Sequence, residues 1–275
     1  MDAEDLIERI AAFPSWNYRF DLGEGISTPV ASAWRVRRQE LRRRYFFEPL
    51  LALTGGTLAG RRVLDLGCNA GFWSLQAIEA GAEFVLGVDG ARSAIEQAEL
   101  VFEAKGVSRE RYSFEAVNIF DWQPAERFDL VLCLGLLDVV AKPLAVFELI
   151  AASGAELVVI DTGISRARGE LFEVGRLNEP RNAVEHELVL VPTRPAVTAL
   201  AKRFGLGTVA LAHEFDADEL GVDDYAAGRR LAFICSSGPS LEGLAAAPEP
   251  AQNAWAGALQ GASRSVRRRF RSAAR

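Results

Sequence analysis

A glycine turn flanked by two acidic residues is the part of this sequence best suited to bind a cofactor. The turn follows an apolar segment and has the sequence Val63-Leu-Asp-Leu-Gly-Cys-Asn-Ala-Gly71. Side chains at the two glycine positions would block a ligand approaching the backbone, and the amides at the start of a following helix would point toward the same space. Asp89 ends the next apolar segment, and its carboxylate can accept hydrogen bonds from two ribose hydroxyls. This pattern predicts a nucleoside-cofactor site.

The spacing of the glycines distinguishes between nucleoside cofactors. A dinucleotide fingerprint has the form G-x-G-x-x-G, in which the second glycine admits a pyrophosphate. Here the pattern is Asp65-x-Gly67-x-x-x-Gly71, and Asn69 stands where that second glycine would be. The sequence therefore favours a single nucleoside without a pyrophosphate.

The elements that must position these residues alternate between strand and helix from residue 61 to residue 160. We expect strands near 62–66, 84–88, 112–117, 128–134 and 155–161, followed by two more near 207–213 and 230–236. This alternation predicts an α/β fold with a doubly wound, mostly parallel sheet. Ligands bind outside the carboxyl ends of such strands, so we expect one crevice to be lined by Asp65, Asp89, Asn118, Gly135 and Asp161.

The ordered set of two acids and a glycine turn resembles the class I S-adenosylmethionine-dependent methyltransferases. The resemblance implies a Rossmann-like sheet of seven strands whose last two strands form an antiparallel hairpin. It also implies that Asp65 and the glycine turn hold the methionine part of S-adenosyl-L-methionine and that Asp89 holds its ribose. On this basis the cofactor-binding residues are Asp65, Gly67, Cys68, Asn69, Gly71, Asp89, Gly90, Asn118, Ile119, Leu134 and Gly135.

A narrower resemblance links residues 16 to 160 to the bacterial transfer-RNA wobble-uridine carboxymethyltransferases and their uncharacterised methyltransferase relatives. It is carried by Phe20-Asp-Leu-Gly-Glu-Gly-Ile-Ser-Thr28, by the helix that follows and by the glycine motif. In that family a tyrosine, a helix lysine and a late arginine hold an extra cofactor carboxylate. Arg230 matches the arginine, but Arg43 or Arg44 stands at the lysine position and Asp138-Val139 replaces Tyr-His. Because Asp138 would repel a second carboxylate, we expect ordinary S-adenosylmethionine.

Methyl transfer to an oxygen or nitrogen can require a base that removes the acceptor's proton. The sequence has two histidines, and His186 lies in the segment expected to cover the crevice, so it ranks first as catalytic base. Asp161 and Asp138 follow, and His213 ranks last. A solvent-exposed role for His186 and helix- or turn-capping roles for the two aspartates remain open alternatives.

The composition of the chain narrows the classes of binding partner and the expected cellular location. The formal net charge is -6 and the pI about 5.2, which argues against general nucleic-acid binding. A small-molecule acceptor, such as a natural product or sugar-like compound, is therefore favoured; a transfer-RNA substrate and a non-catalytic binding protein remain alternatives. We expect no transmembrane segment and no secretory signal. The three cysteines are far apart and lack paired spacing, which predicts no metal site and a reducing cytoplasmic location.

The predicted organisation has three parts. Residues 1–55 form a helical and loop extension, residues 56–237 form the cofactor-binding domain with a lid at 162–193, and residues 238–275 form a mobile linker and basic tail. The tail suits a disordered segment, a helix that contacts a membrane surface or protein partner, or a nucleic-acid contact. One helix is expected from Trp34 to Leu53, and its stripe of Arg35, Arg38 and Arg42 suits either a solvated face or an anion-binding surface.

Overall fold

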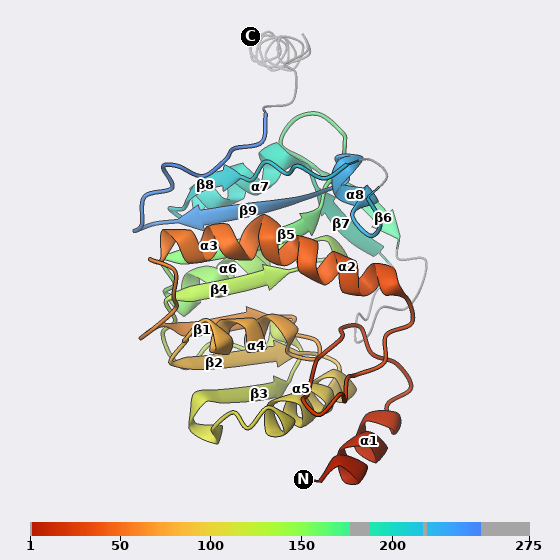
Figure 1. Cartoon of the computed structure of the whole chain (residues 1–275). Helices are drawn as coiled ribbons and strands as arrows, with labels where there is room; N and C mark the ends of the chain where they lie inside the picture. The colour runs from red at the N-terminus through yellow and green to blue at the C-terminus, as the bar shows by residue number, and fades with distance from the viewer. Residues whose placement is uncertain (1, 177–187, 217–218, 249–275) are drawn as a thin grey trace, which may run out of the picture.

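A seven-stranded sheet forms the centre of the protein (Figure 1). The computed structural model describes residues 2–176, 188–216 and 219–248. The strand order is β3-β2-β1-β4-β5-β9-β8, the first five strands are parallel, and β9 runs antiparallel to both of its neighbours. The strands are β1 (Arg62–Leu66), β2 (Phe84–Asp89), β3 (Tyr112–Ala116), β4 (Leu130–Leu134), β5 (Leu157–Gly163), β8 (Gly207–Ala210) and β9 (Arg230–Ser236). The predicted α/β fold with a mostly parallel, seven-stranded sheet is confirmed.

Helices cover both faces of this sheet, because the inner strands are apolar on both sides. On one face, residues such as Val63 and Val85 share a buried cluster with residues of the N-terminal helices and of α4 and α5. On the other face, Leu64 and Val131 pack with residues of α6 and α7. The helices are α1 (Ala3–Ala11), α2 (Ala33–Arg42), α3 (Glu48–Leu53), α4 (Phe72–Glu79), α5 (Arg92–Ala104), α6 (Pro143–Ser153), α7 (Arg194–Arg203) and the short α8 (Asp223–Ala226). Single 3-10 turns lie at Arg109–Arg111, Ile119–Asp121 and Leu137–Val139.

The helix expected from Trp34 to Leu53 contains a π-helical turn. Residues Arg43–Phe47 form this turn between α2 and α3, and the amide of Glu48 donates to the carbonyl of Arg43, five residues earlier. Pro49 follows at once and has no amide hydrogen with which to continue the regular helical pattern. A π turn inserts one extra residue, which shifts the direction of the side chains around it. Arg42 and Tyr45 lie at this insertion, and both are buried.

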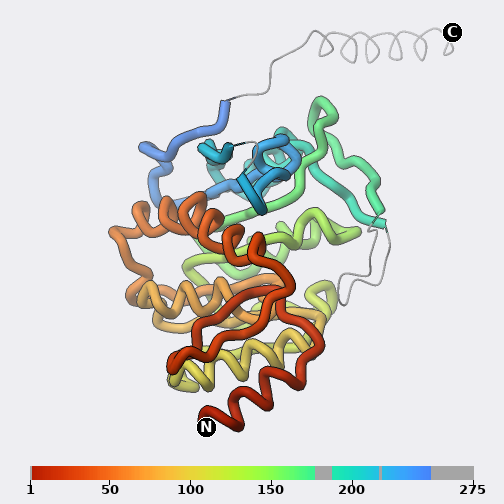
Figure 2. The backbone as a smooth tube through the Cα atoms, turned by 45° about the vertical axis from the view of Figure 1, so that its right-hand side comes forward, coloured from red at the N-terminus to blue at the C-terminus, as the bar shows by residue number. Residues whose placement is uncertain are grey.

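The chain between α1 and α2 loops over the glycine turn. Figure 2 shows this red and orange segment beside the yellow helix α5, and Figure 1 shows it at the end of the sheet toward which the arrows of the parallel strands point. Asn17 donates to the side chain of Asn69 at 3.3 Å, and the ring of Tyr18 stacks on Phe72 with centroids 4.9 Å apart. The N-terminal extension therefore borders the predicted cofactor crevice.

Two further segments differ in character from the main sheet. The predicted lid contains a separate antiparallel pair, β6 (Phe172–Arg176) and β7 (Leu188–Pro192), and β7 contacts the turn after β4 through a bond from the Leu190 amide to the Val140 carbonyl.

The described residues after 238 do not form the expected mobile linker. The Ala212 amide donates to Ala245, and the Ala247 amide donates to Ala210, so this segment lies along the free edge of β8. No helix in the described ranges is long and apolar enough to span a membrane.

Candidate active site

Asp65 lies at the carboxyl end of β1 and is buried. Its Oδ2 accepts a 2.7 Å hydrogen bond from the hydroxyl of Ser74 in α4. Burial raises the pKa of Asp65 to about 7, and the nearby charge of Asp89 adds to the increase, while the Ser74 bond opposes it. A carboxyl group with such a pKa is poised between its neutral and charged forms at pH 7. A cationic ligand placed beside it would favour the charged form.

Backbone geometry and packing explain both glycines of the turn. Gly67 and Gly71 have φ angles of +72° and +74°, in the region that disfavours side chains. A Cβ atom on Gly67 would lie 3.3 Å from Cδ1 of Leu136, whereas one on Gly71 would lie 3.1 Å from Cβ of Ala98 and from Cζ of Phe114. Gly71 therefore allows α5 and β3 to pack against the turn. Gly67 allows the side chain of Leu136, which follows β4, to pack against the turn.

Asp89 connects the end of β2 with the glycine turn. Its Oδ2 accepts a 2.9 Å bond from the amide of Asn69, and its Oδ1 accepts a 2.8 Å bond from the amide of Ala91. Burial raises the pKa of Asp89, although both amide bonds oppose the increase. A carboxylate has about four acceptor sites, so this partly exposed group retains acceptor capacity for hydroxyl donors. Gly90, which follows it, is exposed.

The other predicted cofactor residues lie at the same edge of the sheet. The amide of Gly135 donates to the Asp161 carbonyl at 2.7 Å, which joins the ends of β4 and β5. Asn118 follows β3 and is exposed, but its side chain accepts from the Phe120 amide and donates to Asp121. The side-chain amide group of Asn118 is thus already used to form a turn. Buried positions are occupied by Cys68, Ile119 and Leu134.

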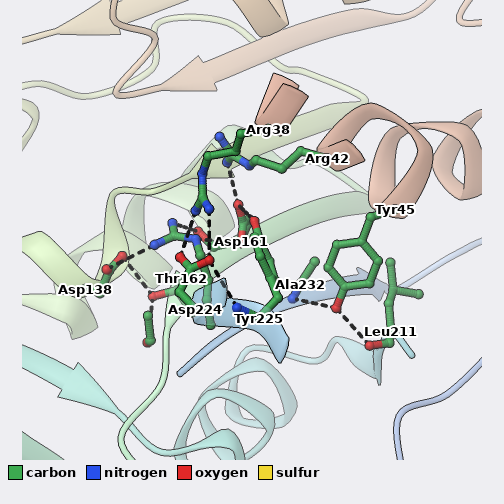
Figure 3. Close-up of polar contacts among 12 residues, drawn as sticks. Arg38, Arg42, Tyr45, Asp138, Asp161, Thr162, Leu211, Asp224, Tyr225 and Ala232 are labelled. Carbon is green, nitrogen blue, oxygen red and sulfur yellow. Dashed lines mark hydrogen bonds and ion pairs between the residues drawn. The ribbon is translucent and has the colours of Figure 1, made fainter. Parts of the chain in front are cut away.

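Asp161 is fully buried at the centre of a charged cluster, shown in Figure 3. It forms ion pairs with Arg42 and with Arg230, whose Nε lies 3.0 Å from Oδ1, and it accepts a 2.8 Å bond from the Tyr225 hydroxyl. Burial alone would raise the pKa of Asp161, but Arg230, Arg42 and Tyr225 outweigh burial and hold it below its ordinary value. A carboxylate with these partners is a weak proton acceptor and a strong anchor for the elements around it.

Asp138 lies at the margin of the same cluster. It forms an ion pair of 3.4 Å with Arg230 and accepts a 3.2 Å bond from the Thr162 hydroxyl. Arg230 is therefore shared by two carboxylates, and its guanidinium charge is already balanced within the protein. A Cβ on Gly135 would lie 3.2 Å from Nη2 of Arg230, so this side chain also borders the predicted crevice.

Two of the three arginines in the α2 stripe are paired with carboxylates, so the stripe as a whole is neither a solvated face nor an anion-binding surface. Arg42 points inward to Asp161, its side chain is only 8% exposed, and its guanidinium lies 5.2 Å from the Trp73 ring centroid. Arg38 binds Asp224 through two 2.8 Å bonds, while Arg35 remains near the surface and donates to Asn17. The roles of Arg42 and Tyr225 were missed because their partner, Asp161, is 119 and 64 residues distant, respectively.

Of the two histidines, His213 lies within the described residues and His186 does not. His186 lies outside the described residues, so its role as a base stays a prediction. His213 follows the edge strand β8, stacks on Phe215 with centroids 5.2 Å apart, and lines a cavity with Tyr225 and Arg230. Its Nδ1 is enclosed and has no hydrogen-bond partner within the described ranges. Position in the sequence had placed His213 last among the candidate bases, yet it shares a cavity with residues of the Asp161 cluster.

The three cysteines are buried free thiols. Burial raises the pKa of all three, and that of Cys235 reaches about 12. These thiols therefore remain protonated near neutral pH and serve packing. The described residues contain no group of three or more His, Cys, Asp or Glu side chains arranged to hold a metal ion.

The sheet order, with a reversed penultimate strand and an acid-flanked glycine turn after β1, defines a Rossmann-like methyltransferase fold. Residues 58–181 match the family described as a methyltransferase domain. This part of the chain is therefore similar to that family of methyltransferase domains. The N-terminal domain of EvdMO1, crystallised in the presence of SAH and D-fucose, has the same fold, with a TM-score of 0.65 and 19% identity over 87% of this chain and 98% of that domain.

Curated relatives match different portions of the chain. A ubiquinone biosynthesis O-methyltransferase from Neisseria meningitidis is 32% identical over 135 residues, which cover 47% of this chain and 56% of that protein. A tRNA U34 carboxymethyltransferase from Citrifermentans bemidjiense is 28% identical over 218 residues, covering 76% of this chain and 61% of that protein. The chain thus spans little more than half the length of the first relative. The second match supports the predicted resemblance to wobble-uridine carboxymethyltransferases.

Proposed function

We propose that this protein is an S-adenosylmethionine-dependent methyltransferase that acts on an oxygen or nitrogen of a small molecule. The observation that carries the proposal is the bond between the Asn69 amide and Asp89, because it brings the glycine turn and the second acid into one site. The family match over residues 58–181 supports the same assignment. The O-methyltransferase relative supports a small-molecule acceptor.

The residues present fit the proposed cofactor. Gly67 and Gly71 give the turn its left-handed backbone, and Asp89 retains acceptor sites for the ribose hydroxyls. The buried carboxyl of Asp65 would be stabilised in its charged form by the ammonium group of the cofactor. Ile119 and Leu134 would supply apolar contacts, and Gly135 would allow close approach of the backbone. When bound, S-adenosylmethionine supplies an activated methyl group, so the protein needs no nucleophile of its own.

The protein's main contribution to the reaction would be to bind and orient the acceptor and to exclude water. The Asp161 cluster ties α2, β5, β9 and α8 together at the edge where the acceptor would lie. Among the predicted bases, Asp161 and Asp138 suit positioning because both are paired with Arg230. His186, in the proposed lid 162–193, remains the first candidate for proton removal. The buried free thiols suit a reducing location such as the cytoplasm.

Calorimetric titration with S-adenosylhomocysteine tests the proposed cofactor site. We expect Asp89→Asn to weaken binding by about ten- to a hundredfold, because hydrogen bonds that involve a charged group contribute roughly 1.5–3 kcal/mol. Glu83→Gln is the matched control: Glu83 precedes β2 at its opposite end and is exposed. Equal affinity for the Asp89 variant and wild type, with both folded, would contradict the proposal.

A transfer-RNA substrate is the second candidate, favoured by the match that covers 76% of this chain. It predicts tight transfer-RNA binding whose affinity falls steeply with salt, because phosphate contacts release counterions. The negative net charge of the chain favours the small-molecule alternative. A binding protein without catalytic activity would bind the cofactor but show no methyl transfer to either class of acceptor.

A further inference from the structure

A cavity of about 490 Å³ lies at the carboxyl edge of β5 and beside the starts of β9 and α7. Its walls come from the loop after β5, the start of α7, the segment that follows β8, and residues next to Arg230. The volume falls in the range of small-ligand pockets. It lies beside the Asp161 cluster, and its lining residues do not include Asp65, Asp89 or the glycine turn.

The polar side chains of this cavity are cationic or neutral. Three arginines line it, Arg166, Arg194 and Arg230, and no aspartate or glutamate is among its lining residues. Arg230 is balanced by Asp161 and Asp138, and Arg194 donates to the carbonyls of 247 and 248. The side chain of Arg166 is exposed, and no ion pair joins it to another residue in the described part of the chain. Arg166 therefore makes the cavity attractive to an anion.

The loop that carries Arg166 is held in place by its neighbour. Ser165 is buried; its hydroxyl donates to Glu173 at 2.6 Å and accepts from the Ala167 amide, and its own amide donates to the Pro192 carbonyl. A side chain on an anchored loop loses less entropy when it binds a ligand than one on a loosely held segment. Apolar side chains such as Ile164 and Leu231 complete the wall, so the cavity suits a ligand with an apolar body and one polar end.

Arg230 connects this cavity to the proposed cofactor crevice. It lines the cavity and also lies next to Gly135, which follows β4 and borders the crevice. Arg230 therefore borders both the cavity and the predicted crevice. His213, whose enclosed Nδ1 lacks a partner among the residues described, lines the same space and offers a polar contact.

We propose that this cavity is the acceptor pocket and that it selects small acceptors with an apolar body and a carboxylate or phosphate, bound by Arg166. This inference rests on the proposed methyltransferase function, since it assigns the acceptor to a cavity next to the cofactor crevice. The role of Arg166 is recognition, and it takes no part in proton transfer.

Binding of matched probes to the full chain tests the proposal. Calorimetry with saturating S-adenosylhomocysteine would compare 4-hydroxybenzoate and phenyl phosphate with neutral 4-hydroxybenzamide. We expect both anions to bind at least tenfold more tightly than the amide, and Arg166→Gln to remove most of that difference, as loss of a charged hydrogen bond would. Arg168→Gln is the matched control because Arg168 is an exposed arginine of the same loop outside the cavity lining. It should bind like the wild type.

Several outcomes would overturn the assignment. The assignment is refuted if none of the three probes binds at millimolar concentration. It is also refuted if 4-hydroxybenzoate and 4-hydroxybenzamide bind with equal affinity, or if Arg166→Gln and Arg168→Gln lose equal affinity for the anions. Displacement of S-adenosylhomocysteine by benzoate would place the anion in the cofactor crevice and also refute it. If the anions bind in an Arg166-dependent way but S-adenosylhomocysteine does not bind, the proposed function fails while the anion site remains.

Discussion

Replacing Arg42 tests whether the buried ion pair with Asp161 stabilises the site region. Arg42→Met keeps a side chain of similar length but leaves Asp161, which is fully buried, with Arg230 and Tyr225 as its remaining polar side-chain partners within the described ranges. Removing one partner of a buried ion pair typically costs about 3–5 kcal/mol. Because two donors remain, we expect a decrease near the lower end, about 3 kcal/mol, in the free energy of unfolding.

The control is Arg38→Met on the same helix. Arg38 and Asp224 form a bidentate pair, but their side chains are 20% and 29% exposed. Solvent screening reduces the value of such a pair to about 1 kcal/mol. Urea unfolding, followed by circular dichroism, should therefore separate the two variants by about 2 kcal/mol with equal m-values. Equal stabilities of the two variants, or an Arg42 variant within 1 kcal/mol of wild type, would refute the argument.

The pH dependence provides a second check on the same pair. In the folded protein the pKa of Asp161 is below its ordinary value, so its contribution to stability is present above pH 4 and is lost as the pH falls through the folded-state pKa. Removing Arg42 raises that folded-state pKa. The stability difference between variant and wild type should therefore be largest near pH 7 and shrink toward pH 3.

Two further predictions concern the glycine turn and the acid before it. Burial raises the pKa of Asp65 to about 7, so between pH 4 and 7 the folded protein binds more protons than the unfolded chain and loses stability as the pH rises. Asp65→Asn removes this loss, so the free energy of unfolding of the variant relative to that of wild type should increase by up to about 4 kcal/mol between pH 4 and 7. Urea unfolding at several pH values measures this difference, and a difference that does not change with pH would contradict the raised pKa of Asp65. Gly71→Ala should lower the free energy of unfolding by about 2–3 kcal/mol, because the new Cβ would make a contact of 3.1 Å on a left-handed backbone. Gly106→Ala should lower it by only about 1 kcal/mol, because Gly106 has a φ of +64° but open space around it. Equal losses of thermal stability in the two alanine variants would rule out overpacking at Gly71.

The periodicity of the sequence located the main sheet well. The expected strands at 62–66 and 230–236 coincide with β1 and β9, and the others overlap their counterparts. Buried parallel strands are apolar on both faces, which makes them distinct from the helices between them. Prediction was less successful beyond residue 236, because the segment at 245–247 pairs with the edge of β8 through backbone groups that composition does not reveal.

The amino-acid sequence by itself determined the α/β fold and the acid-flanked glycine turn. Both depend on local patterns: apolar runs that specify strands, and glycines that adopt positive φ angles within a few residues of each other. Only the tertiary structure decided that Arg42 points inward, that Asp161 is an ion-paired anchor and that Arg166 borders a cavity. Those roles depend on a π turn in the helix and on partners that are distant along the chain, and charge patterning along one helix cannot distinguish a buried ion pair from a solvated face.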